Sequence, residues 1–229
     1  HVCDACQPRV PAVRDQLSVA DTTHDSRLDA AHGVLQDVFG YSTFRPGQAE
    51  VIAAVLEGRD CIAVMPTGAG KSLTFQIPAR ILDGTVLVIS PLISLMKDQV
   101  DALQSLGFRA AAINSTLDFE ERRSRLAELR RGDLELVYLA PERLMSGDFL
   151  SEVRSWNVTA LAVDEAHCIS QWGYDFRPSY LRVSALREYF PSVKIVALTA
   201  SATKVQHSIE ALMERRWTTT QQMGDYQAV

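Results

Sequence analysis

The chain has 229 residues and a mass of 25.3 kDa, enough for one domain with a sizeable core and too short for two full ones. Its 47% hydrophobic and 22% charged residues are an ordinary globular balance, and a net charge of −5 gives no support to nucleic-acid binding, although a local groove matters more than the total. No apolar stretch approaches a membrane span and no signal-peptide core precedes the first element, which excludes a membrane-spanning chain and predicts a soluble protein of the cytoplasm, the nucleoid or the nucleus.

The first thirty residues show no clear period and contain several Asp, Thr, Ser and Pro residues. We expect residues 1–30 to form a flexible arm, residues 31–214 one folded domain, and residues 215–229 an irregular tail. Cys3 and Cys6 form a CxxC pair, which is at most half of the four-ligand set of a structural zinc site. A solvated tail therefore explains this pair better than a metal site.

From Ala31 onward helical and strand patterns alternate. A helix is expected over 32–39, and Pro46 opens another that runs to 56 and stops at Gly58. Further helices are predicted from 71, over 91–106, and over 118–131 with a solvated charged face, while 109–113 is short and apolar. Buried strands are predicted at 60–65, 85–90, 134–139, 158–163 and 193–198. Apolar strands joined by helices indicate an α/β domain whose mostly parallel sheet carries helices on both faces.

The strongest chemical signal is the sequence MPTGAGKS at residues 65–72. It follows an apolar strand and opens a helix, the context that a phosphate-binding loop requires, although Met65 stands where the general pattern has Gly. Small residues let backbone N–H groups wrap the phosphates of ATP, with Thr67, Gly68 and Gly70 in the loop. Lys71 is expected to bind the β- and γ-phosphates, and Ser72 to be a ligand of Mg²⁺.

The second signal is the sequence DEAH at residues 164–167, which ends the predicted strand 158–163. A carboxylate at the carboxyl end of a strand lies where open α/β sheets bind their ligands. Asp164 fits the partner of Mg²⁺, and Glu165 is placed to orient and deprotonate the attacking water. A solvated turn explains an isolated Asp-Glu pair, but not one paired with a phosphate loop.

These two motifs together resemble the helicases with a DEAD/DEAH box, which have a RecA-like P-loop NTPase fold and in which His167 would be a further catalytic residue. The sequence FGYSTFRPGQ at 39–48 is similar to the adenine-recognition motif of RecQ-type DNA helicases. By position, Gln48 would pair with the adenine edge, while Tyr41 and Arg45 would stack on the ring, as an amide and flat side chains can do.

Further segments resemble RecQ motifs. The sequence SPLISLMKDQ at 90–99, with Ser90 and Lys97, looks like a motif that touches the DNA backbone, and residues 138–144 and 197–203 resemble two more. Residues 168–178 look like the aromatic-rich loop that senses single-stranded DNA, so Trp172, Phe176 and Arg177 would contact it. The alternative for these aromatic residues is the core. Tyr174 stands where the family has His, so the coupling between DNA and ATP is expected to be altered. Ser201 stands where the family has Thr, which is a mild change.

The resemblance implies ATP- and Mg²⁺-dependent, 3′-to-5′ unwinding of tailed duplex DNA in recombination and repair. Nothing in the 229 residues matches the second RecA-like domain of such motors or its arginine finger, so this chain alone is expected to hydrolyse ATP slowly and not to unwind DNA. Two alternatives remain open: an RNA helicase of the DEAH class, and a catalytically inactive, truncated DNA-binding module.

Overall fold

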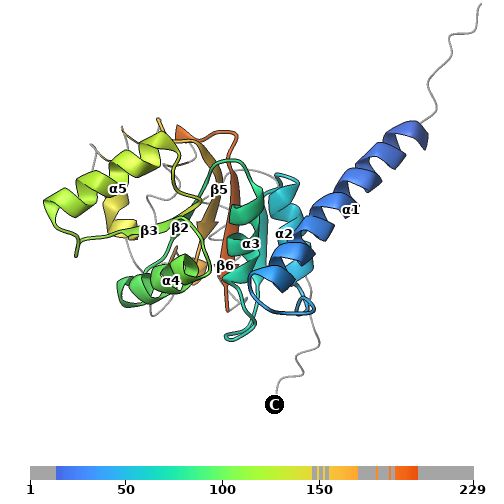
Figure 1. Cartoon of the computed structure of the whole chain (residues 1–229), viewed down its shortest axis with the longest axis horizontal. Coiled ribbons are helices and arrows are strands. Elements are labelled where there is room, and N and C mark those ends of the chain that lie inside the picture. The colour runs from blue at the N-terminus through green and yellow to red at the C-terminus, as the bar shows by residue number, and fades with distance from the viewer. Residues whose placement is uncertain are drawn as a thin grey trace, which may run out of the picture.

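A computed structural model describes residues 14–145, 155–169 and 189–200, together with residues 149, 152, 179 and 186. Its centre is a six-stranded sheet in which every pairing is parallel, with the strand order β1-β6-β5-β2-β4-β3 (Figure 1). Ile89 pairs with both Leu139 and Val163, so the carboxyl ends of the central strands lie level at one edge. The strands are β1 Cys61–Val64, β2 Thr85–Ile89, β3 Ala110–Ile113, β4 Leu136–Leu139, β5 Val158–Val163 and β6 Lys194–Thr199.

Two apolar cores cover the two faces of this sheet, because successive side chains of a strand point to opposite faces. Val86 and Val88 of β2 pack into the core that faces α2, α3 and α4, whereas Leu87 and Ile89 pack into the core on the other face. The predicted parallel sheet with helices on both faces is confirmed. The helices are α1 Arg14–Asp37, α2 Gln48–Leu56, α3 Leu73–Ile81, α4 Ile93–Ser105 and α5 Phe119–Arg131, with short 3-10 helices η1 Pro141–Met145 and η2 Ala166–Ile169.

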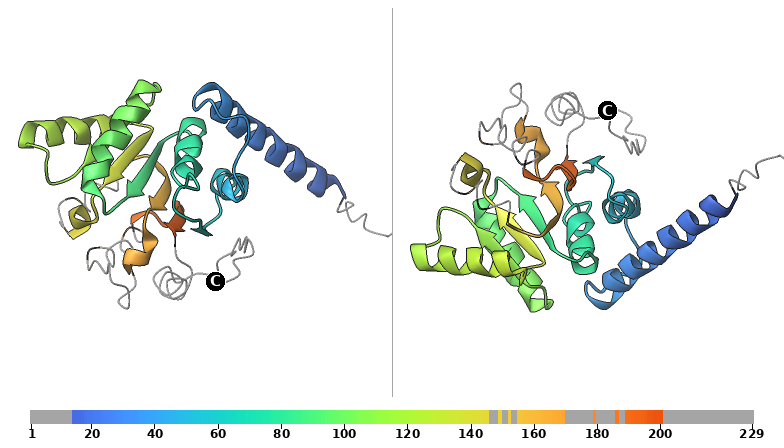
Figure 2. Two further views of the ribbon diagram at one scale, coloured as in Figure 1. Left: turned by 90° about the horizontal axis from the view of Figure 1, so that it is seen from below. Right: turned by 90° about the horizontal axis from the view of Figure 1, so that it is seen from above.

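The expected flexible arm over 1–30 is wrong for residues 14–30, which belong to the long helix α1 (Figure 2). The sequence has neither Gly nor Pro between Pro11 and Gly33, so no residue interrupts helical hydrogen bonding there. Leu35 near its end is fully buried against α2 and α3, and the guanidinium of Arg27 donates to the carbonyl of Leu56 at 2.6 Å. Cys3, Cys6 and the predicted tail at 215–229 lie outside the described residues.

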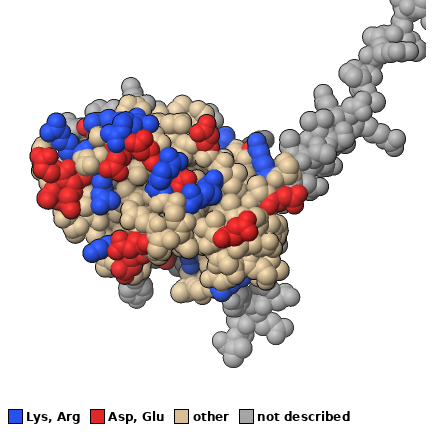
Figure 3. Space-filling model, viewed as in Figure 1, with Lys and Arg blue, Asp and Glu red and all other residues tan. Residues whose placement is uncertain are grey.

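The charged helix α5 begins with a capping box, in which Asp118 accepts from the backbone N–H of Glu121 and the side chain of Glu121 accepts from the backbone N–H of Asp118. It ends at Gly132, whose φ is 75°. Leu129 is its one buried residue, and basic and acidic side chains are interspersed around α5 (Figure 3). The predicted solvated face of this helix is therefore confirmed.

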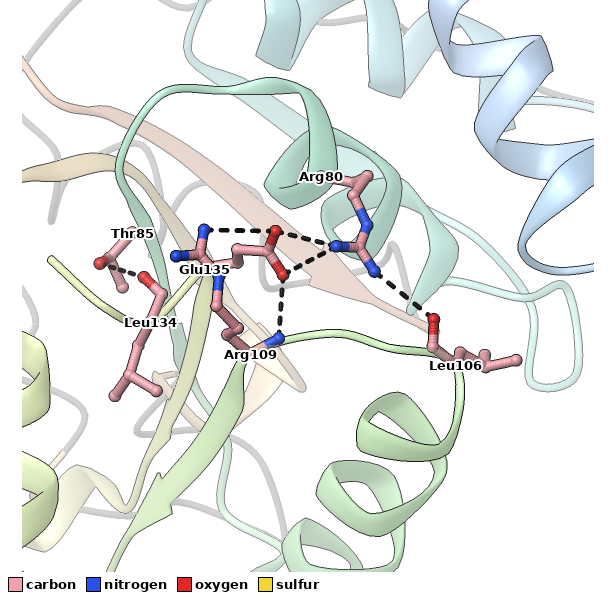
Figure 4. Close-up of polar contacts among 6 residues, drawn as sticks. All are labelled: Arg80, Thr85, Leu106, Arg109, Leu134 and Glu135. Carbon is pink, nitrogen blue, oxygen red and sulfur yellow. Dashed lines mark hydrogen bonds and ion pairs between the residues drawn. The ribbon is translucent and has the colours of Figure 1, made fainter.

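A buried carboxylate ties α3 to the sheet edge opposite the phosphate loop (Figure 4). Glu135, which is 9% exposed, accepts from the guanidinium of Arg80 at 2.9 and 3.2 Å and from the backbone N–H of Arg109 at 2.9 Å. The guanidinium of Arg80 also lies 4.1 Å from the ring centre of Phe108. Because α3 starts at the phosphate loop, this cluster fixes the far end of the helix that carries the loop.

We expect Glu135→Ala to lower the free energy of unfolding by about 2–4 kcal/mol, somewhat less than the roughly 3–5 kcal/mol that breaking a fully buried ion pair costs, since Arg80 is partly solvated. Urea denaturation followed by circular dichroism measures it. Asp133→Ala is the matched control, because Asp133 pairs with Arg131 at 2.7 Å on the surface and should cost about 0.5 kcal/mol or less. Equal losses for the two variants would contradict the role given to Glu135.

Candidate functional site

The predicted phosphate loop connects β1 to α3 at the carboxyl edge of the sheet. Gly68 and Gly70 have φ angles of 82° and 76°, values that residues with a Cβ rarely adopt, which explains the two glycines. The backbone N–H of Met65 donates to the carbonyl of Thr199 at 2.9 Å, and that of Ala69 donates to the carbonyl of Pro66 at 3.1 Å. The loop is thus an ordered turn attached to β6, and it leads directly into a helix N-terminus.

The two residues expected to meet phosphate and metal follow this turn. The ammonium of Lys71 donates to the carbonyl of Met65 at 3.2 Å, so it lies folded over the loop. Ser72 is the N-cap residue of α3, and its side chain makes no capping hydrogen bond. An ammonium and a hydroxyl at a helix N-terminus are groups suited to a polyphosphate with its magnesium ion.

The acidic motif lies at the end of β5, beside the end of β2. The hydroxyl of Ser90 donates to Oδ2 of Asp164 at 3.4 Å, and the backbone N–H of Glu165 donates to Oδ1 at 3.0 Å. Glu165 has a φ of 47°, the one positive φ of a non-glycine residue in the described part of the chain, and such strain is typical of functional sites. Nδ1 of His167 lies 3.2 Å from Oε2 of Glu165, an ion-pair distance without the geometry of a hydrogen bond.

Burial raises the pKa of Asp164, and the negative charge of Glu165 raises it further. The N–H of Glu165, the positive charge of Lys71 and the hydroxyl of Ser90 act in the opposite direction. The influence of Lys71 on this pKa indicates that the phosphate loop and the acidic motif share one electrostatic environment. A divalent cation would favour the charged carboxylate, so Asp164, with Ser72 of the phosphate loop, is a residue that could hold Mg²⁺.

The predicted base motif packs directly on the phosphate loop. Gln48 is 1% exposed; its Oε1 accepts from the backbone N–H of Arg45 at 2.9 Å, and its Nε2 donates to the carbonyls of Ala69 and Gly70, each at 3.0 Å. The guanidinium of Arg45 donates to the carbonyl of Gly68. The sequence predicted that these residues would face adenine, but it did not predict that they would hold the loop.

A pocket of about 400 Å³ lies beside this motif, between the end of α1, α3 and α4. Tyr41, Arg45 and Gln48 line it together with Gly70 and Ser72 from the phosphate loop. Tyr41 is 51% exposed, so its ring is available for stacking on a base. Gln76 and Gln99 also line the pocket, and the sequence did not predict either there. Gln99 ends the motif at 90–99 that was expected to touch DNA, and the signal for Gln76 was helical spacing, one turn after Ser72.

The two described residues that were predicted to contact DNA, Ser90 and Lys97, have different surroundings in the structure. Ser90 is buried and its hydroxyl points to Asp164, so it belongs to the acidic site, whereas Lys97 is exposed on α4. Trp172, Phe176 and Arg177 lie outside the described residues. Within the described ranges, no helix has the length and apolar character needed to cross a bilayer, and no three His, Cys, Asp or Glu side chains cluster as a metal site.

Comparison with known proteins supports this arrangement. The model of the DEAD/DEAH box helicase family matches residues 45–209. Over 172 residues the chain is 52% identical to the ATP-dependent DNA helicase RecQ of Haemophilus influenzae, covering 75% of this chain and 28% of that protein. It is also 52% identical over 182 residues to RecQ of Bacillus subtilis, covering 79% of this chain and 31% of the relative. The chain thus spans less than a third of these relatives.

The fold is also similar to that of a solved helicase structure. A hypothetical ATP-dependent RNA helicase from Sulfolobus tokodaii superposes with a TM-score of 0.64 at 18% identity, covering 83% of this chain and 56% of that one. At 18% identity this similarity supports the RecA-like fold and says nothing about function. The family match covers more than half of the residues and includes both the phosphate loop and the acidic motif. The chain therefore belongs to the DEAD/DEAH box helicase family, in which its sequence resembles the RecQ helicases.

Proposed function

We propose that the chain is the ATP-binding motor domain of an ATP-dependent DNA helicase of RecQ type. One observation carries the proposal. The phosphate loop follows β1, and Asp164 and Glu165 follow β5, so both motifs lie at the carboxyl ends of strands of the same parallel sheet. The names of the relatives at 52% identity support DNA as the nucleic acid. The same proposal includes unwinding of a tailed duplex in the 3′-to-5′ direction and a role in recombination and repair. It also includes a location in the cytoplasm, the nucleoid or the nucleus.

Each residue of the site has a defined task in this proposal. Lys71 and the loop amides bind the phosphates, and Ser72 and Asp164 hold Mg²⁺, which neutralises charge on the transferred phosphoryl group. Glu165, whose carboxylate lies 3.2 Å from the ring of His167, takes the proton of the attacking water. Lys97, Trp172, Phe176 and Arg177 would contact single-stranded DNA. An arginine finger from a second RecA-like domain would complete the charge around the γ-phosphate, so slow hydrolysis by this chain alone stays a prediction.

The test measures ATP hydrolysis by the chain, at single turnover, with a single-stranded DNA oligonucleotide, with RNA of the same sequence, or with neither. We expect DNA to accelerate hydrolysis more than RNA. Greater stimulation by RNA would favour an RNA helicase. Binding of DNA without any binding of Mg-ATP would favour the inactive module.

We expect the chain to prefer ATP to GTP, because a site that pairs with the adenine edge leaves polar groups unpaired when guanine binds. A preference of about 10-fold or more is expected for the wild type, and Gln48→Ala should reduce it. Competition of unlabelled ATP and GTP against a fluorescent ATP analogue measures both values. Equal competition by the two nucleotides, unchanged by Gln48→Ala, would show that Gln48 does not select the base.

A further inference from the structure

One glutamine of the pocket beside the phosphate loop has a buried oxygen that accepts no hydrogen bond. Gln48, Gln76 and Gln99 all line this pocket. Gln48 donates to the phosphate loop, and Gln76 donates to the hydroxyl of Tyr138 at 3.2 Å. Oε1 of Gln99, in contrast, is buried and has no donor within the described part of the chain. Because a buried acceptor without a donor is costly, such an atom at a pocket indicates where a ligand would place a donor.

Gln99 belongs to the face of α4 that borders the pocket. Ala102, Leu103 and Leu106 follow it at helical spacing and line the pocket with it, whereas Lys97 of the same segment is exposed. The segment resembles a motif for the DNA backbone, but the phosphate oxygens of DNA are acceptors, and a carbonyl oxygen cannot donate to them. The buried oxygen therefore fits a ligand that carries a donor.

The lining of the pocket indicates which part of a nucleotide lies near this oxygen. Leu103 and Leu106 contribute apolar surface on the same helix face as Gln99, whereas Gly70 and Ser72 mark the phosphate end. Of the parts of ATP, the base is the one with flat apolar faces, so the apolar part of the pocket suits the base. Adenine carries an exocyclic amine, a hydrogen-bond donor, where guanine carries a carbonyl oxygen.

We propose that Gln99 is a specificity-determining residue whose Oε1 accepts a hydrogen bond from the exocyclic amine of adenine. The inference rests on the proposed function in taking residues 65–72 as a nucleotide-binding loop, and it adds a residue of α4 to the base site. Guanine would bring an oxygen against Oε1, and two acceptors cannot bond, so the same contact selects against GTP. Purine riboside triphosphate, in which hydrogen replaces the amine of ATP, isolates the contact.

The experiment measures the affinities of the chain for Mg-ATP and for the magnesium complex of purine riboside triphosphate by calorimetry. We expect the wild type to bind ATP about 10-fold more tightly, as a hydrogen bond to an otherwise unpaired buried group predicts. Gln99→Met keeps the length of the side chain without the acceptor, so it should bind ATP less tightly and lose this preference. The matched control is Gln104→Met on the same helix, whose exposed amide donates to the carbonyl of Ala110 at 2.8 Å and which should keep the preference.

Gln99→Glu separates the contact from a general effect on packing. It keeps the size of the side chain and its acceptor, so the preference for ATP over purine riboside triphosphate should stay at about 10-fold, while the added negative charge weakens the binding of both ligands. Loss of the preference in Gln99→Glu, or its persistence in Gln99→Met, would overturn the inference.

Binding of a single-stranded DNA oligonucleotide tests the other reading of this residue. Weaker DNA binding by Gln99→Met, with an unchanged preference between the two nucleotides, would assign Gln99 to DNA and overturn the inference. A wild type that binds ATP and purine riboside triphosphate equally would overturn the inference alone. A wild type that binds neither nucleotide would overturn the proposed function as well.

Discussion

Replacing Lys71 with Ala is expected to lower the affinity for Mg-ATP by about 100-fold or more, since hydrogen bonds to charged groups contribute about 1.5–3 kcal/mol each and this ammonium would serve two phosphates. The ammonium donates to the carbonyl of Met65 at 3.2 Å, inside the loop, so it is already close to where the phosphates would bind. Little reorganisation is then needed on binding. Calorimetry on wild type and variant measures the difference.

The matched control for this substitution is Lys194→Ala. Lys194 opens β6 and so lies at the opposite edge of the sheet, yet its loss changes the net charge by the same amount. A general effect of charge on an anionic ligand would weaken both variants alike. If Lys71→Ala bound Mg-ATP as tightly as Lys194→Ala, residues 65–72 would not be a nucleotide-binding loop.

The fold could be predicted largely because its strands are buried on both faces. The largely apolar runs at 85–90 and 158–163 correspond to β2 and β5 within one residue, since no charged residue, Gly or Pro interrupts them. The order of the strands could not be predicted, because β1 pairs with β6 across more than a hundred residues and no local pattern records that pairing. The helical start of α1 was missed because its residues lack an apolar period, although nothing in them breaks a helix.

The site was predictable where its chemistry depends on local sequence. The turn at Gly68 and Gly70 and the acidic pair at 164–165 need particular residues at fixed spacing, and the structure has the expected loop and strand end. Contacts between distant segments left no such signal. The bonds from Gln48 to the loop join residues more than twenty positions apart, and Ser90 reaches Asp164 across 74. Glu135 belongs to no motif, and only the packing of α3 on the sheet shows what it does.

Replacing Glu165 with Gln is expected to slow ATP hydrolysis by about 100- to 10,000-fold, the contribution of a positioned general base. The amide has the same shape as the carboxylate but cannot accept the proton of the attacking water. Asp164 keeps its bonds to Ser90 and to the backbone N–H of residue 165, so the metal site should persist and Mg-ATP should bind with nearly wild-type affinity. The loss should therefore fall on the rate of the chemical step.

Single-turnover hydrolysis with saturating single-stranded DNA and excess protein measures that step, and calorimetry on the same samples measures binding. Glu128→Gln is the control, since Glu128 lies on the solvated helix α5, away from the acidic motif, and accepts from the hydroxyl of Ser124 at 3.1 Å. The strained φ of 47° at position 165 is a backbone property that Gln shares, so a slow Glu165→Gln cannot be ascribed to relief of strain. Hydrolysis by Glu165→Gln at the wild-type rate, with intact binding, would remove Glu165 from the chemistry and leave the proton to another acceptor.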